Sequence, residues 1–284
     1  MTIEMGLLGA HLREHEVSPE AARVVEEAGY GTLWLDASPP ADLLPVQRLL
    51  DATTRLRVAT SVVNVWTADP VTVAASYHRI EAAHPGRFLL GVGIGHREVD
   101  TGYTAPYDTL VSYLDVLNST GVPADRIVLA ALGPRMLRLA RDRTAGTVPC
   151  LVPPVHTRGA RAILGAGRML LPGHFAVLDD DIERARATAR SGPPGQALRV
   201  ANYAANLRRL GYTDQDLAGS GSDALIDALT AHGDAATVAA RLTAHLEAGA
   251  NQVGVYPLGD DPVTVLRGVA DAFFAAHTPS RSGE

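Results

Sequence analysis

The stretch that decides the fold is Gly86-Arg87-Phe88-Leu89-Leu90-Gly91-Val92-Gly93-Ile94-Gly95-His96. Residues 88–92 form a short apolar run that follows Pro85-Gly86 and precedes alternating glycines, so they predict a buried strand that enters a glycine-opened loop. The glycines remove side chains where the strand ends, which would let the backbone approach a planar or phosphorylated ligand. They would equally ease plain packing, and His96 adds a titratable side chain at this edge.

Outward from this stretch, predicted strands alternate with predicted helices about eight times, the pattern of a parallel sheet covered by helices. The predicted strands are residues 4–8, 32–35, 58–63, 88–92, 127–131, 148–152, 169–171 with 175–178, and 252–256. Residues 27–33 and 247–253 repeat the same helix end, glycine stop and strand entry, so the first and last units are built alike. We therefore expect an α/β protein, a (β/α)₈ TIM barrel. Its single domain would span residues 1–277, with a helical insertion near strand 7 at about 179–222 and a flexible tail at 278–284.

The composition excludes several classes of function. The chain has 284 residues, of which 46% are hydrophobic, and a net charge of −6, which argues against a nucleic-acid or anionic-membrane partner. All 25 basic residues are arginine, so neither Schiff-base chemistry on a lysine nor a P-loop lysine is available. Cys150 is the only cysteine and is expected to be a small core residue. No signal peptide or membrane span is visible, and we expect a cytoplasmic protein.

In such a barrel, ligands bind where the strands end, and this rule selects the candidate residues. We expect His11 and Trp66, after the first and third strands, to contact the substrate. Asp36 ends the second strand and is either a turn cap or a ligand contact. The segment from Leu132 to Arg135 opens a helix with free amides and an arginine, which suits a phosphate but also fits an ordinary proline-started helix.

Three other motifs do not fit. The 91–95 glycines are not a dinucleotide-binding fingerprint, because His96 stands where glycine is needed and the next helix comes too late. Residues 11–15 match the H-x-x-E-H pattern of some zinc proteases, but that chemistry needs both histidines on one helix face, and a polar loop is expected here. The serine-hydrolase pattern G-x-S-x-G is absent. We expect no bound metal.

Three long motifs together resemble the luciferase-like monooxygenase superfamily, in particular its actinobacterial branch of coenzyme F420-dependent oxidoreductases. They are ATSVVNVW at residues 59–66, PGRFLLGVGIGH at 85–96 and LAALGPRM at 129–136. Residues 206–212 and 247–250 are also similar to this branch.

The resemblance implies a barrel that holds a deazaflavin or flavin ring against a bulge in the third strand with a non-proline cis peptide, here between Ser61 and Val62. It implies that Asp36 and Asn64 touch the ring and that Gly93, Gly95 and His96 contact it from the fourth strand. It also implies that Leu132, Gly133 and Arg135 lie near the cofactor's tail and phosphate. A homodimer is expected on the same ground.

Two departures shift the expected chemistry. Some relatives carry a histidine where this chain has Ala37, and a glutamate proton donor where it has His96. We therefore expect His96 to be the acid/base and, with Asp36, a catalytic residue of hydride transfer between F420 and a small organic substrate. FMN-dependent monooxygenation is the alternative cofactor chemistry, and a degenerate flavin-binding or assembly barrel is the non-enzymatic alternative.

Overall fold

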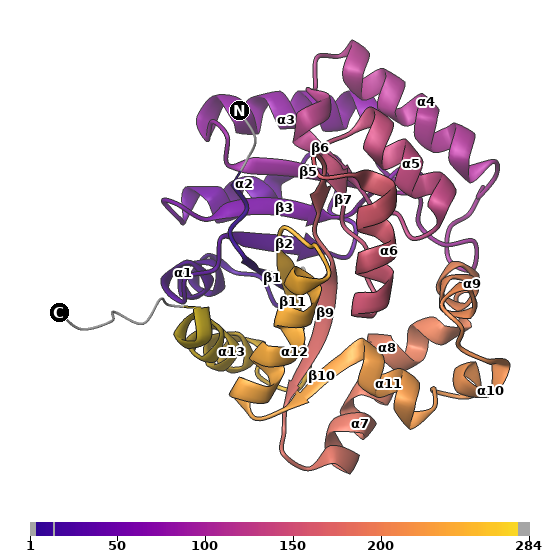
Figure 1. Ribbon diagram of the computed structural model, residues 1–284. Coiled ribbons are helices and arrows are strands. Elements are labelled where there is room, and N and C mark those ends of the chain that lie inside the picture. Colours follow the sequence, from indigo (N-terminus) through magenta and orange to yellow (C-terminus); the bar gives the residue numbers. More distant parts are fainter. Residues whose placement is uncertain (1–3, 14, 278–284) are drawn as a thin grey trace.

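The computed structural model describes residues 4–13 and 15–277, in which parallel strands alternate with helices (Figure 1). The strands are β1 (Leu8–Arg13), β2 (Thr32–Asp36), β3 (Arg57–Ser61), β4 (Val63–Asn64), β5 (Phe88–Gly93), β6 (Ile127–Leu129), β7 (Gly146–Thr147), β8 (Met169–Leu170), β9 (Gly173–Leu178), β10 (Thr230–Gly233) and β11 (Val253–Pro257). The helices that follow barrel strands are α1 (Pro19–Glu27), α2 (Leu44–Asp51), α3 (Pro70–Ala83), α4 (Pro106–Ser119), α5 (Pro134–Arg143), α6 (Pro154–Leu164), α12 (Ala235–Glu247) and α13 (Pro262–His277).

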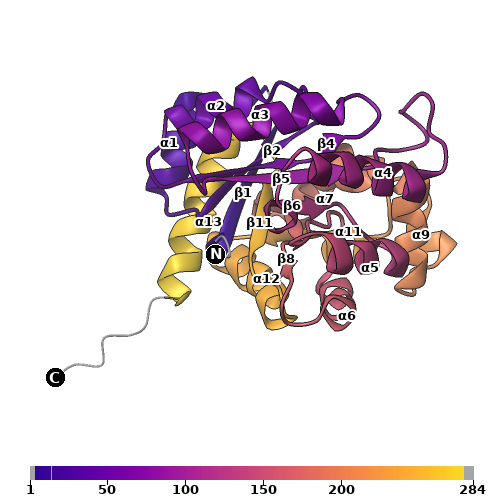
Figure 2. The ribbon, with the colours of Figure 1, turned by 90° about the horizontal axis from the view of Figure 1, so that it is seen from above.

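Hydrogen bonds close the sheet into a barrel. Its order is β10-β9-β11-β1-β2-β3-β5-β6-β7-β8, with β4 paired to β5. The Leu171 amide donates to the Thr147 carbonyl beside β7 (2.9 Å), and the Asn251 amide donates to the Leu170 carbonyl beside β11 (2.8 Å). Because β8 and β9 are successive parts of one segment, these bonds join the two ends of the sheet. Figures 1 and 2 show the helices around the strands, and the predicted (β/α)₈ barrel is confirmed.

The prediction for the first strand was wrong. β1 runs from Leu8 to Arg13, not over residues 4–8, and pairs with β2 from Gly9 opposite Thr32 to Arg13 opposite Asp36. Gly9 does not end the strand. Its missing side chain leaves room for Gln252, whose Oε1 would lie 2.5 Å from an added Cβ. As a result, residues 11–13 of the predicted loop are strand, residues 15–16 form a turn, and residue 14 lies outside the described residues.

Two apolar layers hold the barrel. Alternate residues of β1, such as Leu8 and Leu12, belong to the large cluster between strands and helices. A second cluster fills the lower barrel interior around the fully buried Trp34, with Leu89 and Met169. These side chains fill that part of the barrel interior, whereas the cavity described below lies where the strands end.

The connection between β9 and β10 is helical and lies to one side of the barrel (Figures 1 and 2). It contains α7 (Ile182–Ser191), α8 (Pro193–Gln196), α9 (Ala201–Arg209), α10 (Asp214–Leu217) and α11 (Asp223–Leu229), with a 3₁₀ turn at Ala197–Arg199. Within residues 4–13 and 15–277, no helix combines the length and apolar character that crossing a membrane requires.

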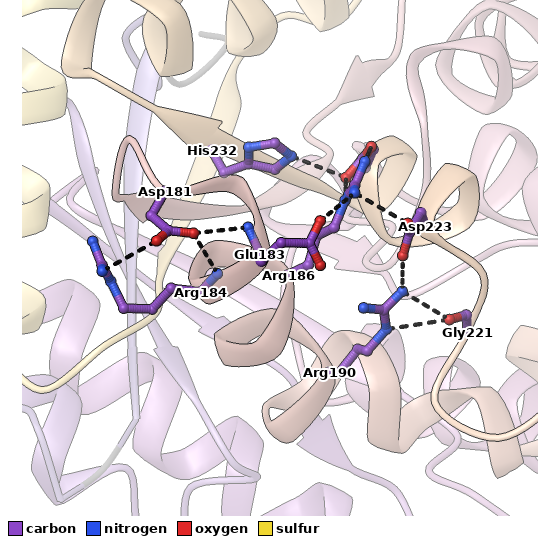
Figure 3. A network of polar contacts seen from close by, with 9 residues as sticks. Asp181, Glu183, Arg184, Arg186, Arg190, Gly221, Asp223 and His232 are labelled. Atoms are coloured by element: carbon purple, nitrogen blue, oxygen red, sulfur yellow. Dashed lines mark hydrogen bonds and ion pairs between the residues drawn. The ribbon is translucent and has the colours of Figure 1, made fainter.

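Ion pairs tie this helical connection together (Figure 3). Arg186 on α7 binds both carboxylate oxygens of Asp227 on α11, at 3.0 and 2.7 Å, and also reaches Asp223 at 3.0 Å. Arg190 pairs with Asp223, and His232 on β10 contacts Asp227 at 2.9 Å. The network fixes α7 and α11 relative to the strand that leads back into the barrel.

Candidate functional site

A cavity of about 550 Å³ opens where the strands end, between the barrel and the helices that follow β9. Nine of the residues expected at the site line it: His11, Asp36, Ser61, Val62, Asn64, Gly93, Gly95, His96 and Leu132. The structure does not bring Trp66, Gly133 or Arg135 to the cavity lining. Its size is that of a site for a cofactor or drug-sized molecule.

The third strand is interrupted at the cavity wall. β3 ends at Ser61, β4 begins at Val63, and the peptide bond between Ser61 and Val62 is cis. The cis peptide implied by the sequence resemblance is thereby confirmed. Val62 lies on the cavity side of this break, opposite Gly93 of β5.

The glycines of β5 and of the loop that follows it serve packing more directly than expected. A Cβ on Gly91 would lie 1.9 Å from the Thr60 carbonyl oxygen, and one on Gly93 would lie 2.2 Å from Val62. At Gly95, where φ is +61°, it would meet Asp100. The chain's own atoms fill the space beside all three, so the prediction that they leave room for a ligand ring was wrong, although Gly93 and Gly95 do line the cavity.

The floor of the cavity is polar. His11 Nδ1 lies 3.1 Å from Asp36 Oδ1, and the His11 ring stacks on Tyr256, with centroids 3.8 Å apart. Burial raises the pKa of the Asp36 carboxyl above its ordinary value, and His11 opposes that effect. The Nε2 atom of His11 is buried without a hydrogen-bond partner in the described part of the chain. Only a glycine at position 254 leaves space for the His11 ring, because a Cβ on residue 254 would lie 2.3 Å from Nε2 of His11.

Tyr256 and Cys150 complete this floor, and the sequence analysis missed both. The Tyr256 hydroxyl lies 3.3 Å from Ser61 Oγ, and burial raises the pKa of the phenol well above its ordinary value. Cys150 packs against an apolar cluster, as expected of a core residue, but it also lines the cavity. Burial raises the pKa of its thiol to about 12, so it stays protonated and is no nucleophile at neutral pH. Tyr256 ends the last predicted strand, and the strand-end rule could have found it.

His96 lies on a loop that is held in place by hydrogen bonds to Asp100 and Asn64. Asp100 accepts the His96 backbone N–H at 2.6 Å and the Asn64 amide N–H at 2.7 Å. The other end of the Asn64 side chain accepts the Trp66 backbone N–H at 3.0 Å. Asn64 therefore holds the loop, and the Trp66 indole N–H donates to the Ile94 carbonyl at 2.6 Å, outside the cavity.

The helices after β9 supply the opposite wall of the cavity, and none of their residues was among the candidates from the sequence. Asn202 and Tyr203 of α9 line it, and Asn202 Oδ1 lies 3.2 Å from His96 Nδ1. This contact joins residues 106 positions apart in the sequence, and no local sequence pattern predicts it.

Beyond Leu132, the N-terminus of α5 offers its amides without a side-chain cap. Arg135 is turned away, with its guanidinium 3.7 Å from the centre of the Tyr107 ring. Arg209 of α9 takes its place, because its Nη2 would lie 3.3 Å from a Cβ on Gly133. Arg209 also donates to Asn206 Oδ1 at 3.0 Å, and the Asn206 amide nitrogen is buried without a partner among the described residues. These groups could hold an anion.

The sequence profile of the luciferase-like monooxygenases matches residues 16–120. Over this segment the chain is similar to that family. The matched segment contains β2, β3, the cis peptide, β5 and the His96 loop. No curated protein sequence matches the chain significantly.

Solved structures extend the likeness over the whole chain. An F420-dependent secondary alcohol dehydrogenase in complex with an F420–acetone adduct has a TM-score of 0.73 at 15% identity and covers 94% of this chain and 98% of its own. An F420-dependent tetrahydromethanopterin reductase from Methanopyrus kandleri has 0.70 at 16%, covering 96% and 99%. The oxygenating constituent of 3,6-diketocamphane monooxygenase from Pseudomonas putida, with FMN, has 0.66 at 16%, covering 95% and 97%. At these identities the likeness shows the barrel fold alone.

Proposed function

We propose that this protein is an oxidoreductase that binds coenzyme F420 at the mouth of the barrel and acts on a small organic substrate. The observation that carries the proposal is the cavity beside the cis Ser61–Val62 peptide. That peptide lies within the segment that the luciferase-like profile matches. The solved relatives with this fold include proteins named for F420 and one that holds FMN. FMN is accordingly the second candidate cofactor.

The residues present fit such a cofactor. The cavity has the volume of a site for a cofactor, and Val62, Gly93 and Gly95 are among the residues that line it. For the phosphate, the uncapped amides of α5 and the Arg209 guanidinium supply positive charge, and the buried Asn206 amide nitrogen has no hydrogen-bond partner among the described residues. When bound, the cofactor supplies the ring atom that exchanges a hydride with the substrate.

The protein's own part in the reaction is to orient the ligands and move a proton. His96 lines the cavity and is half-buried, so a substrate can reach its ring while water is partly excluded. A histidine in such a position commonly acts as a general acid or base. Asp36 and Tyr256, whose pKa values are raised by burial, form a polar floor for the ligand.

A titration of the purified full chain with F420 and with FMN, followed by absorbance and fluorescence, tests the proposal. We expect saturable binding of F420 that is tighter than binding of FMN. Tighter binding of FMN would overturn the choice of F420, and no binding of either would overturn the proposal. We further expect Arg209→Gln to weaken binding about tenfold, because it removes a charged hydrogen-bond donor. Arg208→Gln, one residue away and paired with Asp214, is the matched control and should bind like the wild type.

A further inference from the structure

We propose that Asn202 is a positioning residue that fixes the tautomer of His96, with the hydrogen on Nδ1 and with Nε2 left as the proton-accepting atom of the site. The use of that atom in catalysis rests on the function proposed above. The tautomer itself does not, because it follows from contacts within the chain.

The contact between the two side chains sets the direction of the hydrogen bond. Asn202 Oδ1 lies 3.2 Å from His96 Nδ1. An amide oxygen can only accept, so Nδ1 must carry the hydrogen. In a neutral imidazole the other ring nitrogen is then an acceptor. Nε2 of His96 makes no hydrogen bond within residues 4–13 and 15–277, which leaves it free for a ligand.

A second contact from the same loop holds Asn202 in place. Ala201, the first residue of α9, donates its backbone N–H to Glu98 Oε1 at 3.0 Å. That hydrogen bond is the main reason why the pKa of the Glu98 carboxyl lies below its ordinary value. Glu98 of the loop therefore caps the N-terminus of α9, and Asn202 of α9 in turn holds the His96 ring of the same loop. The Tyr203 ring also lies beside His96, at a centroid distance of 5.3 Å.

The backbone of His96 is held independently. Asp100 accepts its N–H, and Asn64 donates to the same carboxylate. With the backbone fixed at one end and Nδ1 at the other, the imidazole presents one free nitrogen to the cavity that it lines. A ligand O–H or N–H can donate to that nitrogen, and an imidazolium can return the proton from the same atom.

Nitrogen-15 NMR of the full chain, with labelled histidine and no added cofactor, tests the assignment. At about pH 8.5, where ordinary histidines are neutral, we expect His96 to show the Nδ1–H pattern, with its signal identified by its loss in His96→Asn. Asn202→Asp keeps an acceptor and should keep the pattern, whereas Asn202→Ala should lose it. Arg208→Gln, on the same helix, should change nothing. An Nε2–H pattern in the wild type, or an unchanged pattern in Asn202→Ala, would overturn the proposal.

Two further measurements separate a positioning role from a structural one. Glu98→Ala removes the cap on α9 without altering either the His96 or the Asn202 side chain. It should lower the population of the Nδ1–H form of His96. An unchanged population would show that the Glu98 cap does not hold Asn202 in place. In the cofactor-loaded protein, Asn202→Ala should lower kcat about tenfold with KM nearly unchanged, and Asn202→Asp should restore most of it. If the wild type binds no cofactor, the proposed function fails while the tautomer experiment still decides this inference.

Discussion

His96 is the residue on which the proposed chemistry depends most directly. We expect His96→Ala to lower kcat by a factor of about 10² to 10⁴, the usual contribution of a general acid or base, while the Kd for the cofactor changes less than about threefold. Steady-state kinetics and the cofactor titration measure the two effects separately. His78→Ala is the control, since His78 lies on α3 outside the cavity and bonds the Thr120 carbonyl. Unchanged turnover would remove His96 from the mechanism.

The glycines of β5 show where prediction from residues reaches its limit. The sequence placed Gly93 at the cavity wall, but it could not tell that the Thr60 carbonyl fills the space beside Gly91 and that Val62 fills the space beside Gly93. We expect Gly91→Ala to lower the free energy of unfolding by at least about 1–3 kcal/mol, because the clash at 1.9 Å is with backbone. Gly159→Ala, in α6 with open space around it, should instead raise it by about 0.5–1 kcal/mol. Urea melts of the two variants measure the difference, and equal stability of Gly91→Ala and wild type would refute the packing argument.

At the scale of single elements, the sequence predicted best where the signal is local. Helices α1 and α3 each begin at a pattern that the sequence displays, an N-cap residue followed by proline, and Ser18 and Asp69 accept the Ala21 and Thr72 amides at 3.1 and 2.8 Å. The first strand was misplaced because its bounds depend on pairing with β2 and β11, which the sequence does not display.

The helices after β9 illustrate the same dependence on distant partners, since the Arg186–Asp227 pair joins α7 to α11. The two side chains are only 14% and 24% exposed, so the paired charges are worth more than a surface pair. We expect Arg186→Leu to destabilise this segment by about 1–3 kcal/mol, as loss of a charged, bidentate contact does. Proteolysis within residues 179–229 should accelerate by about tenfold or more. Arg208→Leu breaks a pair whose side chains are 54% and 85% exposed, and it should change neither the rate nor the stability measurably. Equal cleavage rates in both variants would contradict the assigned role.

At the scale of the whole molecule, a buried polar chain links three elements outside the cavity. Thr157 of α6 lies 2.8 Å from His245 Nδ1 on α12, and His245 Nε2 lies 3.0 Å from His174 Nδ1 on β9. The two histidines are 0% and 3% exposed. Burial lowers the pKa of His174 to about 4 and holds that of His245 well below its ordinary value. The fold therefore depends on both rings being neutral.

Because both rings must be neutral in the folded protein, the free energy of unfolding should decrease as the pH is lowered. The folded pKa of His174 lies below the value of 6.5 for an unperturbed histidine, so between about pH 6.5 and 4 the unfolded chain binds a proton that the folded chain refuses. The free energy of unfolding should be constant above that window and fall within it, by roughly 2 kcal/mol at pH 5 for His174 alone. Urea denaturation between about pH 8 and 5 measures the profile. His174→Asn should be less stable at neutral pH yet show a shallower decline, whereas His78→Gln, an exposed histidine, should follow the wild type. A wild-type profile that is flat down to pH 5 would mean that the buried pair accepts a proton without cost, and the neutral arrangement of β9, α6 and α12 would then be wrong.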